Sequence, residues 1–268
     1  MTEPAGIGHG RLEAHLRAAR DAGRKLLVPY ITGGITTGWV DLLHAAALAG
    51  ADAIEVGIPF SDPVMDGPTI QAASLQALER GTTPASILSD LRAGAAELDV
   101  PLVVMTYVNV PFRMGARRFA AELVEAGVSG VILPDVPLEE LDEWSPAGDA
   151  AGLETVMLAS PISPDDRLAA LCARSRGFVY GVGLLGVTGE RSAVGERTAL
   201  LAKRLKAITD LPVVMGFGVS TPEQAAQIAA DADGVVVGSA LVREVLDGAD
   251  PEAVGHFVAD LRAGLDAN

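Results

Sequence analysis

The stretches AGADAIEV (49–56), EAGVSGVIL (125–133) and ADADGVVVG (230–238) repeat one plan along the chain. In each, the end of a helical pattern is followed by small turn residues and then by a short apolar run rich in β-branched residues. Such runs are continuous rather than alternating, which is typical of strands buried on both faces. The three stretches therefore predict joints between a helix and a parallel strand.

Eight apolar runs of this kind recur, with helical patterns between them. Eight strands that alternate with helices in 268 residues predict an α/β fold, a single (β/α)8 TIM barrel that spans residues 1–268 as one domain. A doubly wound sheet is the alternative, but that fold rarely needs eight evenly spaced units. The runs are LLVPYI (26–31), AIEVGI (53–58), PLVVMTY (101–107), GVILPDV (130–136), ETVMLAS (154–160), GFVYGVG (177–183), PVVMGFGV (212–219) and GVVVGSA (234–240).

Further sequence signals predict where the helices begin. RLEAHLRAARDAG (11–23) predicts an extra N-terminal helix that closes the bottom of the barrel. TTPASIL (82–88), ISPDDRL (162–168) and STPEQA (220–225) each predict a helix with Ser or Thr as the N-cap and Pro at the first helical position. VVGSALVREV (236–245) predicts a short helix directly after the eighth strand.

The composition limits the possible partners. Hydrophobic residues make up 49% of the chain and aromatic residues only 4%, and the net charge is −15. An acidic surface repels nucleic-acid phosphates and anionic membranes, so we expect neither as a partner. The N-terminal segment lacks an apolar stretch, no run is long enough to span a bilayer, and we expect a soluble, cytoplasmic protein. Cys172 is the only cysteine, and its helical context predicts a small buried side chain.

Two acidic residues in AIEVGIPFSDPVMDGPTI (53–70) are candidates for chemistry. Glu55 lies inside an apolar strand, where burial raises the pKa of a carboxyl group toward the range useful for proton transfer. A structural glutamate satisfied by a hydrogen bond is the alternative. Asp66 lies in the loop that follows, where an ordinary Asx-turn with Gly67 is the simpler explanation when Asp66 is taken alone.

Glycines near the last strands indicate an anion site. GVTGERS (186–192) places Gly186 and Gly189 around Thr188, and the seventh strand ends with Gly216 and Gly218. The eighth strand ends with Gly238 and Ser239, at the start of the predicted short helix. Backbone N–H groups at such positions bind phosphate without any Lys or Arg, which suits an acidic protein.

Aromatic residues at strand ends are candidates for a binding pocket, whereas the histidines are not candidates for chemistry. Tyr30, Tyr107, Tyr180 and Phe217 end apparent strands, where they either border a pocket or pack in the core near the barrel rim. None of the four histidines ends a strand, and no His, Asp or Glu pair has metal-ligand spacing on one element. We therefore expect no metal site.

Eight motifs together resemble the tryptophan synthase alpha subunit family. They occur in the order of that family over roughly residues 11–263, and the run E-x-G-x-P-F-S-D-P-x-x-D-G-P-x-I-Q is highly specific. The motifs are VPYITGG (28–34), AGADAIEVGIPFSDPVMDGPTIQ (49–71), VVMTYVN (103–109), GVILPDVPLEE (130–140), GFVY (177–180), GVTG (186–189), GFGVSTPEQ (216–224) and DGVVVGSALV (233–242).

The resemblance implies a lyase of tryptophan biosynthesis that cleaves indole-3-glycerol phosphate to indole and D-glyceraldehyde 3-phosphate by a retro-aldol step. Glu55 matches the acid/base of the family, and Asp66 matches the aspartate that accepts the indole N–H. The match makes Gly189, Gly218, Gly238 and Ser239 phosphate binders and Thr188 a residue that holds Asp66. It places Tyr30, Tyr107 and Tyr180 around the indole site, and Phe217 is a further candidate for binding the substrate.

The resemblance also implies a partner. The family assembles as an αββα complex, whose β subunit carries pyridoxal phosphate, so no cofactor is expected in this chain. Asp62 and Asn109 lie in loops that the family turns toward that subunit. One departure is Gly183, where the family usually has Ser, and this glycine is expected to loosen the base of the loop that covers the site. A stand-alone lyase, a catalytically idle partner that regulates a β subunit and another phosphate-handling barrel are the alternatives.

Overall fold

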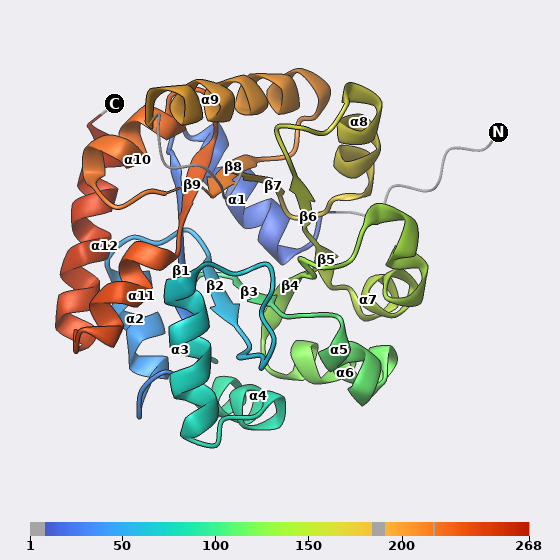
Figure 1. The fold of residues 1–268 in the computed structure, drawn as a ribbon, viewed down its shortest axis with the longest axis vertical. Coiled ribbons are helices and arrows are strands. Elements are labelled where there is room, and N and C mark those ends of the chain that lie inside the picture. The colour runs from blue at the N-terminus through green and yellow to red at the C-terminus, as the bar shows by residue number, and fades with distance from the viewer. Residues whose placement is uncertain (1–8, 184–190, 217, 268) are drawn as a thin grey trace.

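A computed structural model describes residues 9–183, 191–216 and 218–267, with only the backbone described for 191–196. Within these residues, nine parallel strands form one sheet in the order β5-β4-β3-β2-β1-β9-β8-β7-β6. Figure 1 shows the sheet curled into a barrel with helices around it. The strands are β1 (Leu26–Thr32), β2 (Ile54–Gly57), β3 (Leu102–Met105), β4 (Val128–Ile132), β5 (Glu154–Thr155), β6 (Met157–Ala159), β7 (Val179–Val182), β8 (Val213–Gly216) and β9 (Gly234–Val237).

The fifth apolar run forms two short strands rather than one. β5 pairs with β4, and β6 pairs with β7. Val156 lies between them, and its N–H donates to the carbonyl of Val131 at 2.9 Å. The two short strands together therefore take the place of one barrel strand, with β5 paired to one neighbour and β6 to the other, and they close the sheet. The prediction of a TIM barrel built from eight runs is confirmed, with the correction that the fifth run forms two strands.

Helices cover the outside of the barrel, as the 3.6-residue apolar pattern predicts. The described helices are α1 (Arg11–Asp21), α2 (Val40–Leu48), α3 (Pro68–Glu79), α4 (Pro84–Gly94), α5 (Asn109–Met114), α6 (Ala116–Glu125), η1 (Leu138–Glu143, a 3₁₀-helix), α7 (Ser145–Ala151), α8 (Asp165–Arg174), α9 (Arg191–Ile208), α10 (Pro222–Ala229), α11 (Ser239–Leu246) and α12 (Pro251–Asp266). Among these helices, none is long and apolar enough to cross a membrane.

Two of the three predicted helix caps are observed. Thr83 forms a reciprocal capping box with Ser86, and the Thr221 side chain accepts from the Gln224 N–H. The third prediction is wrong, because α8 begins at Asp165 and Pro164 itself occupies the N-cap position. The Ser163 N–H instead donates to the carbonyl of Ser160 at 3.0 Å, which places Ser163 in the preceding turn.

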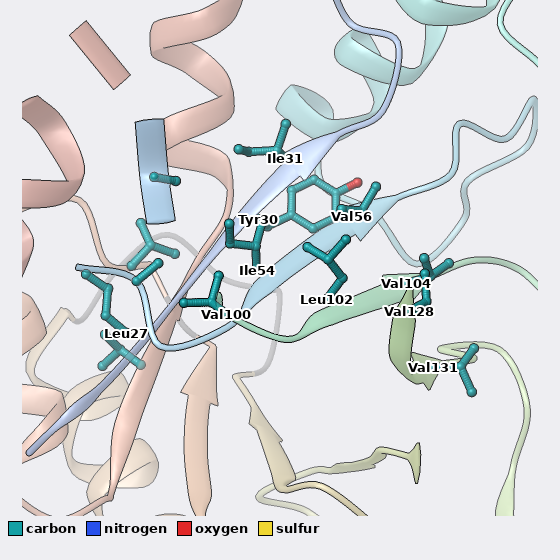
Figure 2. Packing of buried hydrophobic residues seen from close by; sticks show 14 of the residues in the cluster. Leu27, Tyr30, Ile31, Ile54, Val56, Val100, Leu102, Val104, Val128 and Val131 are labelled. Atoms are coloured by element: carbon teal, nitrogen blue, oxygen red, sulfur yellow. The ribbon is translucent and has the colours of Figure 1, made fainter. Parts of the chain in front are cut away.

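Apolar residues fill two layers, which explains why the strands are apolar on both faces. Side chains such as Val28, Val103 and Val236 fill the barrel interior. The residues between them along each strand pack outward beneath the helices, as Figure 2 shows for Leu27, Ile54 and others. Alternate residues on a strand share a face, so Tyr30 and Glu55 belong to the inner face with Val28 and Ala53.

Helix α1 closes the amino-terminal end of the barrel, as predicted. Leu12 and Leu16 are fully buried in the inner layer. The Glu154 carboxylate at the start of β5 accepts from the backbone N–H groups of Leu12 at 2.7 Å and Glu13 at 2.9 Å. A carboxylate at a helix N-terminus satisfies free N–H groups and interacts favourably with the helix dipole.

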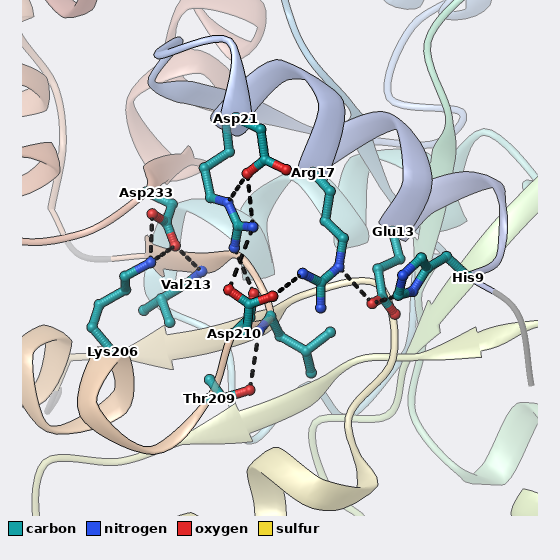
Figure 3. A network of polar contacts seen from close by, with 11 residues as sticks. His9, Glu13, Arg17, Asp21, Lys206, Thr209, Asp210, Val213 and Asp233 are labelled. Atoms are coloured by element: carbon teal, nitrogen blue, oxygen red, sulfur yellow. Dashed lines mark hydrogen bonds and ion pairs between the residues drawn. The ribbon is translucent and has the colours of Figure 1, made fainter. Parts of the chain in front are cut away.

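A polar network around α1 reinforces this end of the barrel (Figure 3). Arg17 bridges Glu13 on α1 and Asp210 in the turn before β8. Lys206 pairs with Asp233, whose carboxylate also accepts from the Val213 N–H at 2.8 Å. These charges lie at the amino ends of the strands, where TIM barrels keep residues for stability, and the fold places sites of chemistry at the opposite end.

Candidate active site

Glu55 is the buried carboxyl group at the centre of the site. It lies on the inner face of β2, is 1% exposed, and its Oε2 has no hydrogen-bond partner among the described residues. Burial raises the pKa of Glu55 to about 8, and the nearby Asp66 charge contributes a second, smaller increase. A carboxyl group with such a pKa is mostly protonated at neutral pH and can both give and take a proton.

Asp66 reaches the same site from the loop after β2. The Tyr107 hydroxyl donates to Asp66 Oδ2 at 3.2 Å and accepts from the Met65 N–H at 2.9 Å. The Tyr107 ring stacks on Phe60, with centroids 4.9 Å apart and planes at 18°. Tyr107 therefore ties both ends of the acidic loop to the carboxyl end of β3.

The environment of Asp66 leaves it more acidic than Glu55. Burial raises the pKa of Asp66 to about 6, although the hydrogen bond from Tyr107 acts in the opposite direction. At neutral pH Asp66 is therefore mostly ionised while Glu55 is mostly protonated. Two carboxyl groups of one site with different pKa values suit two different tasks.

Tyr30 and Tyr180 also lie in the surroundings of Glu55, and their strands β1 and β7 come on the same side of β2 in the order of the sheet. Tyr30 is the register partner of Glu55 on β1, and Tyr180 lies on β7. Burial raises the pKa of both tyrosines above the usual value, and the charges of Glu55 and Asp66 raise it further, so both hydroxyls stay neutral. The charges of both acids therefore act on both tyrosines, and Tyr30 is in addition the register partner of Glu55.

Glycines make room for these two rings. A Cβ at Gly57 would lie 1.9 Å from the Tyr30 hydroxyl, and a Cβ at Gly216 would lie 2.2 Å from Cε2 of Tyr180. Each ring therefore lies over the neighbouring strand, as Figure 2 shows for Tyr30 over β2. Sequence reasoning missed Gly57 and considered Gly216 only for phosphate, because the signal is a side chain from another strand.

Comparisons with known proteins agree with this geometry. The family model described as tryptophan synthase alpha chain matches residues 16–261. The chain belongs to the tryptophan synthase alpha chain family. It is 45% identical to the tryptophan synthase alpha chain of Streptomyces coelicolor over 93% of this chain and 94% of the relative. It is 43% identical to that of Thermobifida fusca, over 96% of this chain and 98% of the relative.

Solved structures of the family share the fold over nearly the full length. The tryptophan synthase subunit alpha of Legionella pneumophila superposes with a TM-score of 0.89 at 33% identity, over 97% of this chain and 100% of that chain. A chain of the aminoacrylate-bound tryptophan synthase of M. tuberculosis superposes with a TM-score of 0.86 at 37% identity, over 96% of this chain and 99% of that chain. Family membership makes this chain a lyase of the tryptophan synthase type.

Of the glycines expected to bind phosphate in this family, Gly238 lies beside β1. Gly238 is the N-cap of α11, has no side-chain cap and faces Cβ of Tyr30, which a Cβ on Gly238 would approach to 3.6 Å. Ser239 is the first residue of α11, so free N–H groups of this helix point toward the barrel mouth. Gly218 has a φ of +54°, a conformation that favours glycine.

Several predicted residues lie outside the described part of the chain. Thr188, Gly189 and Phe217 fall there, as does Gly186. Gly183 is described at the end of β7, half-buried, and its N–H makes a long 3.5 Å contact with the carbonyl of Gly216. The roles expected for these residues from the family stay predictions.

The rim of the barrel mouth carries the residues expected at the partner interface. Asp62 and Asn109 are both exposed. Asp135, which sequence reasoning did not single out, accepts from the Val108 N–H through both oxygens, at 3.0 and 3.2 Å, and so caps the start of α5. Within the described residues there is no cluster of three His, Cys, Asp or Glu side chains that could hold a metal ion.

Proposed function

We propose that this chain cleaves indole-3-glycerol phosphate to indole and D-glyceraldehyde 3-phosphate, with Glu55 as the acid/base and Asp66 as the group that stabilises positive charge. The observation that carries the proposal is the pair of carboxyl groups, raised to pKa values of about 8 and about 6 in one site at the carboxyl ends of the strands. Retro-aldol cleavage of this substrate needs both a proton donor and a fixed negative charge.

Glu55 serves as donor first and acceptor second. In its protonated form it gives a proton to C3 of the indole ring, which converts the ring into an electron-accepting iminium. The bond between C3 and the glycerol carbon then breaks, and its electrons return to the ring. The glycerol hydroxyl becomes the aldehyde as its proton passes to the Glu55 carboxylate, so Glu55 ends the cycle protonated, as it began.

Asp66 holds the other end of the indole ring. As a carboxylate it accepts the indole N–H, and this contact strengthens as positive charge develops on the ring nitrogen, which is the condition for lowering a barrier rather than merely binding substrate. Tyr107 supports this role because its hydroxyl donates to Asp66 Oδ2 and orients it. Thr188 contributes to holding Asp66 in the same proposal.

The phosphate group is assigned to the opposite side of the mouth. Gly218, Gly238 and Ser239, together with Gly189, supply backbone N–H donors there. Tyr30, Tyr107, Tyr180 and Phe217 border the indole ring between the phosphate and the acids. This arrangement lets a chain of net charge −15 bind a phosphate through dipoles alone.

The β subunit of tryptophan synthase is the proposed partner, in an α₂β₂ complex in the cytoplasm. Large apolar side chains are exposed beside Asp62 and Asn109 in sequence: Val64 is 81% exposed, Met65 51% and Phe112 70%. Exposed apolar groups that follow strands at one end of a barrel are typical of a docking surface. Pyridoxal phosphate is assigned to that subunit, since each step above is carried by side chains of this chain.

The test is release of indole from indole-3-glycerol phosphate by the purified protein, with and without a tryptophan synthase β subunit. We expect slow release alone and faster release with the β subunit. Equal rates in both conditions would favour a stand-alone lyase. No indole in either condition would reject the lyase in favour of an idle partner.

Phe112→Ser tests the proposed interface. We expect the variant to keep the basal rate of indole release and to lose most of the stimulation by the β subunit, because an apolar contact is replaced by a polar group. Leu48→Ser is the matched control, since Leu48 is 90% exposed at the end of α2, on the amino-terminal side of the barrel. Full stimulation of Phe112→Ser by the β subunit would show that Phe112 is not part of the interface.

A further inference from the structure

One hydrogen bond joins the helix expected to bind phosphate to the helix that follows Asp66. The guanidinium of Arg243 on α11 donates to the hydroxyl of Thr69 at 2.5 Å. Thr69 is the second residue of α3, and α3 begins two residues after Asp66. Helices α3 and α11 lie side by side and both pack against β1 (Figure 1). The contact therefore links two elements that reach the same barrel mouth.

The first turn of α3 holds the main chain of Asp66. Nε2 of Gln71 donates to the carbonyl of Asp66 at 2.8 Å, and the Gln71 N–H donates to the carbonyl of Gly67 at 3.0 Å. Thr69 lies in this same turn and is 7% exposed. Because Gly67 is the N-cap and offers no side chain, the contact with Arg243 is what ties this turn to the neighbouring helix.

Arg243 belongs to the same short element as the expected phosphate binders. Helix α11 has eight residues, starts at Ser239 and has Gly238 as its N-cap. Ser239 and Arg243 are four residues apart, so they lie on the same side of the helix, one turn from each other. The start of α11 and the Arg243 side chain are therefore fixed relative to each other.

We propose that Arg243 is a positioning residue that sets the place of Asp66 relative to the phosphate-binding start of α11, by holding Thr69 in the first turn of α3. The inference rests on the proposed function for its consequence in catalysis. A substrate with a phosphate at one end and an indole N–H at the other needs both contacts at the same time, at a fixed spacing. The Arg243–Thr69 contact supplies that spacing.

The other contacts of Asp66 do not set this spacing. The Tyr107 hydroxyl holds the Asp66 side chain, but it ties Asp66 to the end of β3 and not to α11. The alternative role for Arg243 is that of a direct phosphate ligand, which has no need of Thr69. The two roles differ in the effect of removing the Thr69 hydroxyl and in how kcat and KM change.

The position of Asp66 can be followed by the ¹³C shift of its carboxyl carbon against pH, in protein with labelled aspartate and with the signal assigned through Asp66→Asn. Burial raises the pKa of Asp66 to about 6, so a loop that leaves the site brings the midpoint down toward the ordinary value of 3.8. Arg243→Met should lower the midpoint by about one pH unit, a tenfold change in the ionisation constant. Loss of the positive charge alone would raise the midpoint, because a nearby cation favours the carboxylate.

Variants of Thr69 test whether Arg243 acts through this hydroxyl. Thr69→Val should lower the Asp66 midpoint as Arg243→Met does, and Thr69→Ser, which keeps the hydroxyl, should keep the wild-type midpoint. The double variant Arg243→Met/Thr69→Val should shift the midpoint no further than either single variant, because both remove one contact. Additive shifts would overturn the inference.

Arg80→Met is the matched control. Arg80 is the C-cap of α3, and its guanidinium donates to the Thr37 hydroxyl, so the same kind of contact is lost at the opposite end of the same helix. This variant should leave both the Asp66 midpoint and kcat unchanged. A midpoint that falls equally in Arg80→Met would overturn the inference, because any loosening of α3 would then suffice.

In the indole-release assay, Arg243→Met should lower kcat about tenfold and change KM less, because the lost contact places a group that acts in the transition state. A raised KM with unchanged kcat would make Arg243 a phosphate ligand and overturn the positioning role, as would an unchanged or raised Asp66 midpoint. The titration needs no turnover, so the two proposals fail separately. A wild-type protein that releases no indole rejects the proposed function and leaves the titration result standing.

Discussion

At the scale of single residues, Glu55 is a side chain that the fold would be more stable without. A carboxyl group on the inner face of a barrel loses its hydration, and the Asp66 charge adds repulsion once it ionises. The raised pKa reflects this loss of free energy. A carboxyl group whose pKa is higher in the folded state than in the unfolded state favours the unfolded state at high pH. Function explains why such a residue stands in an apolar strand.

Glu55→Gln should therefore change how stability depends on pH. The folded-state pKa of about 8 exceeds the ordinary value of 4.5, so wild-type protein loses stability as pH rises from about 4.5 to about 8. Gln cannot ionise, and the variant should lack this loss, which is on the order of 3–5 kcal/mol across the window. Urea unfolding of both proteins at several pH values measures it.

Glu79→Gln provides the control for this comparison, because Glu79 is an exposed glutamate at the end of α3. The same chemical change there should leave the pH dependence as in the wild type. If Glu55→Gln and wild type lose stability in parallel between pH 5 and pH 8, Glu55 is not the buried, reluctantly ionised group described here.

At the scale of elements, repeated patterns made the architecture predictable. The apolar runs, the N-terminal helix and the short helix after the last strand follow from local periodicity and turn residues. The break at Val156 does not follow from local pattern, because it depends on pairing with β4 and β7. The absence of a cap by Ser163 does not follow either, because Ser163 belongs to the preceding turn. The roles of Gly57 and Glu154 were not predicted for the same reason, because each contacts a residue far away in the sequence. Gly57 makes room for the Tyr30 ring, and Glu154 accepts from the Leu12 N–H.

Within the site, the sequence located the two acids but not their relation. Glu55 is recognisable as a charge inside an apolar strand, whereas Asp66 differs from an ordinary loop aspartate only through the family motif that contains it. What the sequence could not supply was the link through Tyr107, which bonds to both Asp66 and the Met65 N–H. Such contacts arise from the pairing of β2 with β3, which brings together the carboxyl ends of the two strands.

The two described glycines expected to bind phosphate, Gly218 before α10 and Gly238 before α11, allow a test that separates binding from backbone strain. Gly238→Ala meets only an ordinary 3.6 Å contact with Tyr30 in the absence of ligand, so it should keep its stability and raise KM for the phosphorylated substrate. Gly218→Ala should also raise KM, but it should in addition lose about 1–2 kcal/mol of stability because its φ is +54°. Thermal unfolding and KM together measure this.

Gly248→Ala is the matched control for strain. Gly248 follows α11, has a φ of +101° and has open space where a Cβ would be. It should lose stability as Gly218→Ala does, with KM unchanged. An unchanged KM in Gly238→Ala would remove the start of α11 from the phosphate site.

At the scale of the whole molecule, stability and chemistry occupy opposite ends of the barrel. The network of Glu13, Arg17, Asp210, Lys206 and Asp233 joins α1 to the amino ends of the strands (Figure 3). The titratable groups with the useful pKa values lie at the carboxyl ends, on loops and strand termini. This division lets the mouth tolerate costly groups such as Glu55, because the opposite end holds the barrel closed.

The most direct test of the central claim is the rate of indole release from indole-3-glycerol phosphate by Glu55→Gln beside the wild type, at neutral pH and with the β subunit present. We predict a loss of roughly 10²–10⁴-fold, as expected when a general acid/base is removed, from a protein that unfolds no more readily than the wild type. Near-normal turnover by Glu55→Gln would contradict the assignment of proton transfer to this residue.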